Sequence, residues 1–158
     1  MANVLRIIVK TSDRLTSLMD WLSSLVILGI RIYLFKVFFW SGWLKLSSWE
    51  STLTLFRYEY HVWLLSPEVA AVIGTAAELC LPVLFLLGLG ARVVPLLFFI
   101  FNLFTVLSYP LLLKPEYYCA LKDHILWGTL IAWVMFHGYG KISMDHWIRS
   151  KFLKNSSL

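Results

Sequence analysis

Four apolar segments dominate this 158-residue chain, and each is long enough to cross the hydrocarbon core of a bilayer. They cover residues 22–43, 69–89, 93–113 and 121–137. A core of about 30 Å needs roughly 20 helical residues, and backbone groups in lipid must be paired within the spanning structure. The strict alternation typical of a membrane β-barrel is absent. The sequence therefore predicts an all-α, integral membrane four-helix bundle that forms a single domain over residues 1–158.

The charged residues set the expected orientation of this bundle. They make up only 15% of the chain, against about a quarter in a soluble domain. The N-terminal arm, the turn at 88–92 and the tail after Gly140 hold eight Lys or Arg residues, and the two opposite loops with their flanking helix ends hold four. The positive-inside rule predicts that both termini are cytoplasmic. The net charge of +5 flanks apolar segments and forms no soluble basic face, so we do not expect nucleic-acid binding.

Residues 48–65 join the first two segments. Apolar and aromatic side chains recur there at helical spacing, and Glu50, Arg57 and Glu59 fall outside their stripe. This pattern predicts an amphipathic helix that lies on the outer surface of the membrane or folds over the mouth of the bundle.

Single polar residues interrupt three of the apolar segments near their midpoints. Arg31 lies in the first, Glu78 in the second and Asn102 in the third. A lone charge deep in a bilayer costs roughly 3 kcal/mol or more, so we expect Arg31 and Glu78 to pair with each other and Asn102 to bridge them. Two interpretations follow. The pair is a packing clamp, or it is the centre of a proton, quinone or solute site.

A second polar cluster is predicted near the outer surface. Lys36 and Lys45 approach this end of the first segment, and Asp123 and His124 open the fourth. Interfacial anchoring and helix capping would explain these residues. The alternative is a substrate vestibule in which His124 titrates near neutral pH. Lys36 lies within the apolar span, although its side chain is long enough to reach the interface.

Motifs for bound cofactors are missing from the sequence. The four histidines do not form a pair with the spacing of a haem or metal site. Neither cysteine belongs to a C-x-x-C pair, and there is no Gly-rich phosphate loop or H-E-x-x-H motif. We therefore predict no haem, flavin or metal site in this chain.

An ordered set of short motifs gives the chain a family resemblance. The motifs are Gly29-Ile30-Arg31, Ser41-Gly42-Trp43-Leu44-Lys45-Leu46, Ala77-Glu78-Leu79, the Leu86–Arg92 turn and Lys122-Asp123-His124. In this order and on four apolar segments, they resemble the DoxX family of small four-helix bacterial membrane proteins. On this resemblance Arg31, Lys45, Glu78 and Asp123 match the polar positions of the family pattern.

The resemblance implies a multi-pass protein of the bacterial inner membrane that supports quinone-linked redox chemistry with a membrane or periplasmic protein partner. In this interpretation Arg31 and Glu78 hold or relay a proton beside a quinone ring, and Lys45, Asp123 and His124 define the outward opening. One alternative is a non-enzymatic scaffold or assembly partner. Another is a small solute or metal transporter lined by Glu78 and the polar stripe Asn102, Thr105 and Tyr109, which would need a homodimer.

Overall fold

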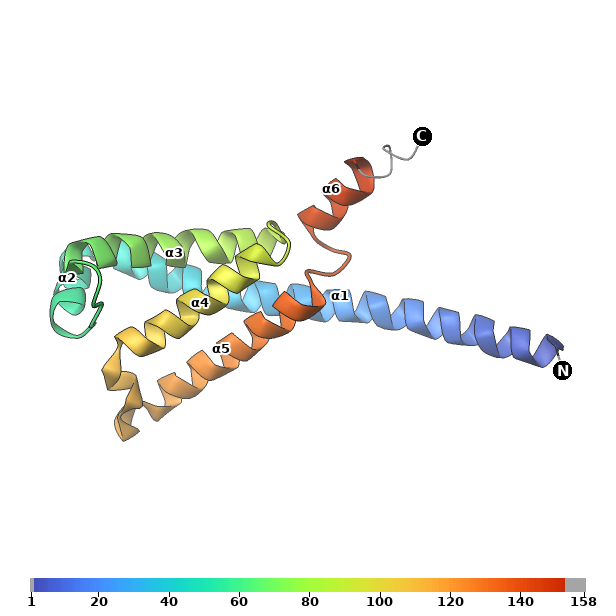
Figure 1. Cartoon of the computed structure of the whole chain (residues 1–158), viewed down its shortest axis with the longest axis horizontal. Coiled ribbons are helices and arrows are strands. Elements are labelled where there is room, and N and C mark those ends of the chain that lie inside the picture. Colours follow the sequence, from blue (N-terminus) through green and yellow to red (C-terminus); the bar gives the residue numbers. More distant parts are fainter. Residues whose placement is uncertain (1, 153–158) are drawn as a thin grey trace.

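A computed structural model describes residues 2–152 of the chain, and in this range it contains helices and no strands. The elements are α1 (Ala2–Ser47), α2 (Trp49–Tyr58), α3 (Pro67–Leu87), α4 (Val93–Ser108), the 3₁₀ turns η1 (Pro110–Leu113) and η2 (Pro115–Tyr117), α5 (Tyr118–His137) and α6 (Met144–Phe152). Figure 1 shows α1, α3, α4 and α5 packed as a bundle, with α2 at one end and α6 at the other.

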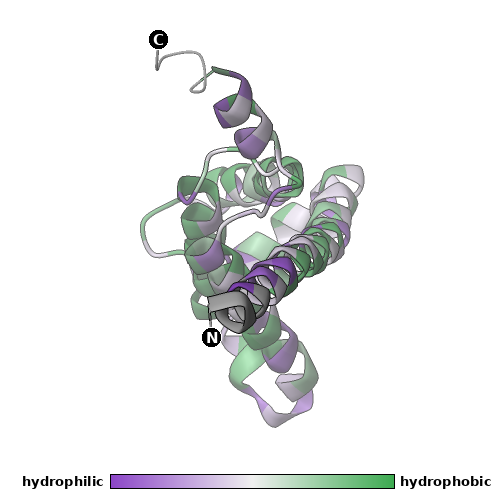
Figure 2. Ribbon diagram, turned by 90° about the vertical axis from the view of Figure 1, so that its right-hand side faces the viewer, coloured by the Kyte–Doolittle hydropathy of each residue, from purple (hydrophilic) through white to green (hydrophobic). Residues whose placement is uncertain are grey.

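Three of the described helices have the length and composition of membrane spans. These stretches are Lys10–Ser47, Pro67–Leu87 and Pro115–His137, and the apolar helix Val93–Ser108 is shorter. Large apolar side chains face outward along all of them, and Figure 2 shows hydrophobic residues over the bundle and hydrophilic ones on α6. A soluble protein does not expose apolar surface on this scale. The predicted fold class, an all-α membrane bundle, is confirmed.

The core of the bundle lies where α1, α3, α4 and α5 meet. Its buried residues come from all four helices and from the segment after α5: Ile27, Leu34, Phe38, Phe85, Val94, Phe98, Ile131, Val134 and Tyr139. Aromatic rings dominate it, and Phe98 packs edge-on against both Phe38 and Phe85, with centroids 4.7 and 5.3 Å apart. Such edge-to-face pairs are favoured over face-to-face stacks. These rings fix the relative positions of α1, α3 and α4.

Helix α3 has well-defined ends. Ser66 precedes it and accepts a hydrogen bond from the Val69 amide at 3.4 Å, and Pro67 occupies the first helical position. Gly88 ends it with a φ of +67°, in the left-handed region that glycine adopts most readily. The short turn after Gly88 places α4 antiparallel to α3.

Helix α4 stops five residues before the predicted end of its apolar segment. The sequence predicts a helix through residue 113, whereas α4 ends at Ser108 and η1 begins at Pro110. Proline has no amide hydrogen for the helix and disfavours the α conformation in the residue before it. Tyr109 accordingly has φ −120° and ψ 79°. The apolar segment therefore continues as a 3₁₀ turn that leads into α5.

Two further boundaries differ from the sequence-based expectation. Helix α1 starts at Ala2, about twenty residues before the predicted span, and its N-terminal half extends beyond the other helices (Figure 1). Helix α2 ends at Tyr58, so residues 59–66 form a loop where the sequence predicted a helix continuing to residue 65. That loop forms part of the candidate site.

Candidate functional site

Helix α1 approaches α3 closely at Gly42. A Cβ atom added to Gly42 would lie only 2.9 Å from the Cβ of Glu78, so any larger residue would push the two helices apart. One turn after Gly42, Lys45 therefore reaches across to α3. Its Nζ lies 2.8 and 2.6 Å from the two carboxylate oxygens of Glu78 and donates to the Ser41 hydroxyl at 3.0 Å. Glycine on α1 thus creates the position at which this ion pair forms.

The Lys45–Glu78 pair is largely removed from solvent. The side chains are 14% and 7% exposed. Separating such a pair by removing one partner costs about 3–5 kcal/mol, because the remaining charge stays buried. The carboxylate of Glu78 and the ammonium of Lys45 therefore form a preorganised donor–acceptor unit in an otherwise apolar part of the bundle.

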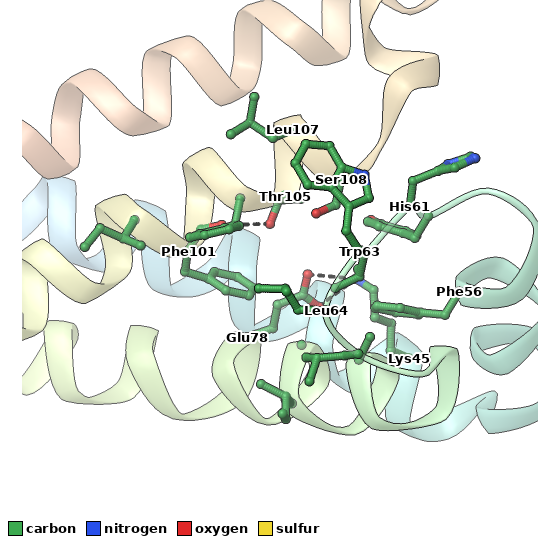
Figure 3. Close-up of a pocket in the computed structure, with 18 of the residues that line it drawn as sticks. Lys45, Phe56, His61, Trp63, Leu64, Glu78, Phe101, Thr105, Leu107 and Ser108 are labelled. Atoms are coloured by element: carbon green, nitrogen blue, oxygen red, sulfur yellow. Dashed lines mark hydrogen bonds and ion pairs between the residues drawn. The ribbon is translucent and has the colours of Figure 1, made fainter.

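A cavity of about 530 Å³ adjoins this ion pair. Lys45 and Glu78 line it together with apolar side chains of α3 and α4 and with the loop between α2 and α3 (Figure 3). These residues include Ile73, Gly74, Leu97, Ile100, Phe101, Phe104, Thr105 and the segment 61–65. The volume falls in the range of small-molecule sites, roughly 300–1,000 Å³. A mostly apolar pocket with one charged pair suits a lipophilic molecule with a polar head.

A stack of three rings supports the outer wall of the pocket, and two of them, Phe56 and Tyr60, line the cavity. Tyr60 stacks on Phe56 at 4.6 Å and on Tyr109 at 4.8 Å between centroids. The Tyr109 hydroxyl donates to Glu59 at 2.6 Å, and the His61 amide donates to the Ser108 carbonyl at 2.7 Å. Burial and the neighbouring Glu78 carboxylate raise the pKa of the Tyr60 phenol above its ordinary value. The ring stack and these two hydrogen bonds hold the loop to the end of α4, and the Tyr60 phenol in the stack stays protonated.

Tyr109→Phe should loosen this loop while keeping the ring stack. The substitution removes the hydrogen bond to Glu59, and bonds to charged groups contribute about 1.5–3 kcal/mol. We expect hydrogen exchange of residues 59–65 to accelerate severalfold, with α5 unchanged. Tyr109→Leu, which also removes the ring contact with Tyr60, should accelerate it further. Unchanged exchange in both variants would show that these contacts do not hold the loop.

Arg31 does not pair with Glu78, and this prediction is wrong. Its guanidinium donates to backbone carbonyls: to Phe85 at 3.0 Å, to Ile142 at 2.6 Å, to Tyr139 at 3.4 Å and to Leu86. The Phe85 and Leu86 carbonyls belong to the last turn of α3, where the regular helical amide donors run out, and Phe85 also accepts from the Gly88 amide at 3.1 Å. The positive charge also suits the negative end of the helix dipole.

The surroundings of Arg31 show a rigid junction between α1, α3 and the segment after α5. Arg31 is 2% exposed, and its guanidinium lies 5.3 Å from the centroid of the Tyr139 ring. The Tyr139 hydroxyl donates to the Leu89 carbonyl at 3.0 Å. Burial raises the pKa of this phenol, although Arg31 opposes the shift. Arg31 therefore ties three chain segments together at the end of the bundle that faces away from the pocket.

Asn102 does not bridge Arg31 and Glu78 either. Its amide donates to the His124 carbonyl at 3.0 Å, and its side-chain oxygen lies 2.9 Å from Nδ1 of His124. Asn102 is buried at 5% exposure, and its two bonds join α4 to the beginning of α5. The three midspan polar residues thus belong to three separate sets of contacts.

The remaining predicted site residues lie outside the pocket. Asp123 and Lys36 are exposed, and neither forms an ion pair among the described residues. Lys36 is on the outer face of α1. Of the four residues expected to line a solute path, Glu78 and Thr105 line the cavity, whereas Asn102 and Tyr109 bond elsewhere. Within residues 2–152, no group of His, Cys, Asp and Glu residues is placed to hold a metal ion.

Sequence reasoning missed the pocket because it missed the loop at 59–66. The aromatic residues of this segment were assigned to one amphipathic helix, and their stacking on Tyr109 depends on the loop reversing direction. One feature of the sequence does point to the ion pair. Lys45 is on the same face of α1 as Arg31, and Gly42 on that face allows another helix to come close to it. The sequence pattern places Lys45 at the outer opening and pairs Arg31 with Glu78, whereas in the structure Lys45 is the partner of Glu78 and Arg31 binds backbone carbonyls.

Comparison with known families identifies the chain. The family model described as DoxX matches residues 26–110, slightly more than half of the sequence. This range includes Arg31, the Lys45–Glu78 pair and all the residues that line the pocket, and it ends before Asp123 and His124. No curated protein and no solved structure matches the chain. The chain belongs to the DoxX family and is a membrane protein.

Proposed function

We propose that this protein is a membrane subunit that binds a quinone in the pocket beside Lys45 and Glu78 and so supports quinone-linked redox chemistry with a partner protein. The observation that carries the proposal is the buried ion pair at the wall of an apolar cavity of about 530 Å³. The DoxX family is frequently linked to redox processes, which agrees with this assignment.

The chemistry of a quinone fits this pocket. A quinone takes up two electrons and two protons to become a quinol, so its site needs hydrogen-bond donors for the ring oxygens and a group that exchanges protons. The Lys45 ammonium is the donor, and the Glu78 carboxylate accepts a hydrogen bond from a quinol hydroxyl and exchanges its proton. In this proposal the electrons come from a redox centre on the partner protein.

The walls of the pocket favour entry from the lipid. Ile73, Leu97 and Phe104 line the cavity and are 53%, 48% and 60% exposed, so its rim lies on the outer face of α3 and α4. A prenylated quinone is dissolved in the bilayer, and we infer that its ring enters laterally between these helices. The tail would stay among the apolar side chains at the rim.

We also infer that the protein lies in a bacterial inner membrane with both termini in the cytoplasm. The described parts of both chain ends lie at the same end of the bundle (Figure 1). That end carries most of the Lys and Arg residues of the chain. The pocket, near the opposite end, then opens in the outer half of the bilayer.

Thr105→Phe tests the proposed pocket. Thr105 lines the cavity across from Glu78 (Figure 3), and among the described residues its hydroxyl bonds only to the Phe101 carbonyl of its own helix. A phenyl group there should occupy the space of the ring and weaken quinone binding at least tenfold, which corresponds to about 1.4 kcal/mol. The measurement is titration of a short-chain quinone into the protein in nanodiscs.

Leu103→Phe is the matched control. Leu103 is on the same helix, is 47% exposed and does not line the cavity, so binding should be unchanged. Equal affinities of the wild type and Thr105→Phe, or no binding by the wild type at all, would contradict the proposal.

A non-enzymatic scaffold is the second candidate, and one observation favours it. Trp63 and Leu64 are 91% and 92% exposed in the loop between α2 and α3. Exposed apolar side chains at one end of a bundle suit docking of another membrane protein. The two candidates differ in what the Lys45–Glu78 pair does, and the variants described in the Discussion separate them.

A further inference from the structure

We propose that α1 carries a homodimer interface, in which a stripe of exposed residues packs against the same stripe of a second copy of the chain. The stripe consists of Leu15, Leu18, Leu22, Leu25, Gly29 and Ile32. We call it the α1 stripe. The proposal does not depend on quinone binding.

The spacing of the α1 stripe is that of a coiled coil. Its members follow one another at intervals of three and four residues, which is the a and d pattern of a heptad repeat. The opposite face of the same helix, with Ser24, Ile27, Arg31 and Leu34, is buried in the bundle. Helix α1 therefore has one face for its own bundle and a second, regularly spaced apolar face that no other described element covers.

The α1 stripe is open along its whole length. Leu15 and Leu18 are both 54% exposed, Leu25 is 53% exposed and Ile32 is 46% exposed. A Cβ atom added to Gly29 would meet nothing within 4 Å, although Gly29 is level with the packed part of the bundle. Small residues on the outer face of a membrane helix allow the backbone of another helix to approach closely.

Lipid alone does not account for the α1 stripe, because α1 continues past the packed bundle and the first residues of the stripe lie on that extension. Helix α1 has 46 residues and is about 69 Å long, whereas the hydrocarbon core is about 30 Å thick. Arg31 lies beside the last turn of α3, so Leu15 and Leu18 are about 20 Å or more beyond the end of that helix. A hydrocarbon core that ends level with α3 does not cover these two residues.

The protruding part of α1 also needs support. Counting from the N-terminal end of α1, the first ion pair between described side chains of α1 and another part of the chain joins Asp20 to Lys141 at 3.3 Å. Most of the stability of a protein helix comes from packing of one of its faces against other elements. A second copy would cover Leu15 and Leu18 and stabilise both helices at once.

Membrane topology fixes the geometry of such a dimer. All copies insert in the same direction, so a two-fold axis along the membrane normal makes the two α1 helices parallel and brings identical positions together. The next heptad position after Ile32 is Lys36, which is exposed. Two facing ammonium groups repel each other, so the interface ends at Ile32.

Cysteine cross-linking in native membranes tests the α1 stripe. In a Cys80→Ser/Cys119→Ser background, Leu18→Cys and Leu22→Cys should give disulfide-linked dimers under mild oxidation. Ser17→Cys and Ser23→Cys are the matched controls, because they are exposed at the same depth but lie about 120° away around the helix. We expect at least fivefold more dimer from the stripe positions. Equal yields at all four positions, or dimers at none, would overturn the proposal.

The molecular mass in solution gives an independent readout. In detergent, light scattering should report a dimer for the wild type and a monomer for Leu15→Glu/Leu18→Glu, whose changes lie outside the packed bundle. Ser17→Glu should remain a dimer. A monomeric wild type, or a double variant that stays dimeric, would overturn the interface. Quinone titration of the same double variant separates this result from the proposed function, because the pocket is far from these positions and should bind normally.

Discussion

Replacing Arg31 with alanine should prevent stable folding of the bundle. The substitution removes the guanidinium donor from four backbone carbonyls, and of these only Phe85 keeps a backbone donor among the described residues, the Gly88 amide. Each unsatisfied buried group costs about 1–3 kcal/mol, so we expect a loss of at least 3 kcal/mol, against a total stability of about 5–15 kcal/mol. Membrane accumulation should fall severalfold, and thermal unfolding in detergent should shift to a clearly lower temperature.

Lys36→Ala is the matched control for Arg31→Ala. It removes a cation from the same helix, but Lys36 is exposed and forms no ion pair among the described residues. Accumulation and unfolding temperature should stay close to wild type. Arg31→Lys should be intermediate, because a single ammonium cannot reach carbonyls that a planar guanidinium spans. If Arg31→Ala behaved like Lys36→Ala, the carbonyl contacts would not hold the bundle together.

Lys45→Met should destabilise the protein more than loss of the whole ion pair does. The single substitution leaves the Glu78 carboxylate buried without its partner, at a cost of about 3–5 kcal/mol. Lys45→Met/Glu78→Gln removes both charges, and replacing a buried pair by neutral groups is often close to neutral for stability. The free energy of unfolding of the double variant should therefore recover by about 2 kcal/mol or more relative to Lys45→Met.

The exposed pair Arg57–Glu68 is the control for this cycle. Its side chains are 49% and 51% exposed, and such pairs contribute about 0–1 kcal/mol. Arg57→Met and Glu68→Gln should each change the unfolding free energy little, alone or together. If the changes in unfolding free energy at Lys45 and Glu78 were additive, as expected for the surface pair, the buried pair would contribute no coupling energy to the stability of the fold.

The Lys45→Met/Glu78→Gln variant also separates the two candidate functions. If the pair exists only for packing, a folded double variant should retain the function of the wild type in its native membrane. If the pair binds and protonates a quinone, the double variant should accumulate but lose quinone-dependent activity. Glu78→Gln alone is less informative, because it leaves the Lys45 ammonium without its carboxylate.

The helices were predictable from the sequence, whereas the pairing of the charges was not. Long apolar segments indicate spans by their length alone. Placing each charge at the middle of its span predicts a pair between Arg31 and Glu78, but helix register depends on packing. Gly42 lies against Glu78, and Arg31 is eleven residues earlier, about 16 Å along the axis. No feature of the span lengths reveals that offset.

The pocket depends on interactions that sequence patterns do not encode. Its outer wall requires Tyr60 to stack on Tyr109, which is 49 positions later in the chain. The break at Pro110 was visible in the sequence, and it ends α4 at the level where Ser108 accepts the His61 amide. The sequence therefore indicates where α4 ends, through Pro110, but it does not indicate that Tyr60 stacks on Tyr109.

Photolabelling with an azido-quinone would test the central claim most directly. The purified protein in nanodiscs would be illuminated with the probe, and the modified peptides would be mapped by mass spectrometry. We expect adducts on the pocket segments 61–65, 73–78 and 97–108, suppressed both by excess unlabelled quinone and by Thr105→Phe. Adducts concentrated at the opposite end of the bundle, around Arg31 and Tyr139, or labelling that excess quinone does not reduce, would contradict a quinone site at Lys45 and Glu78.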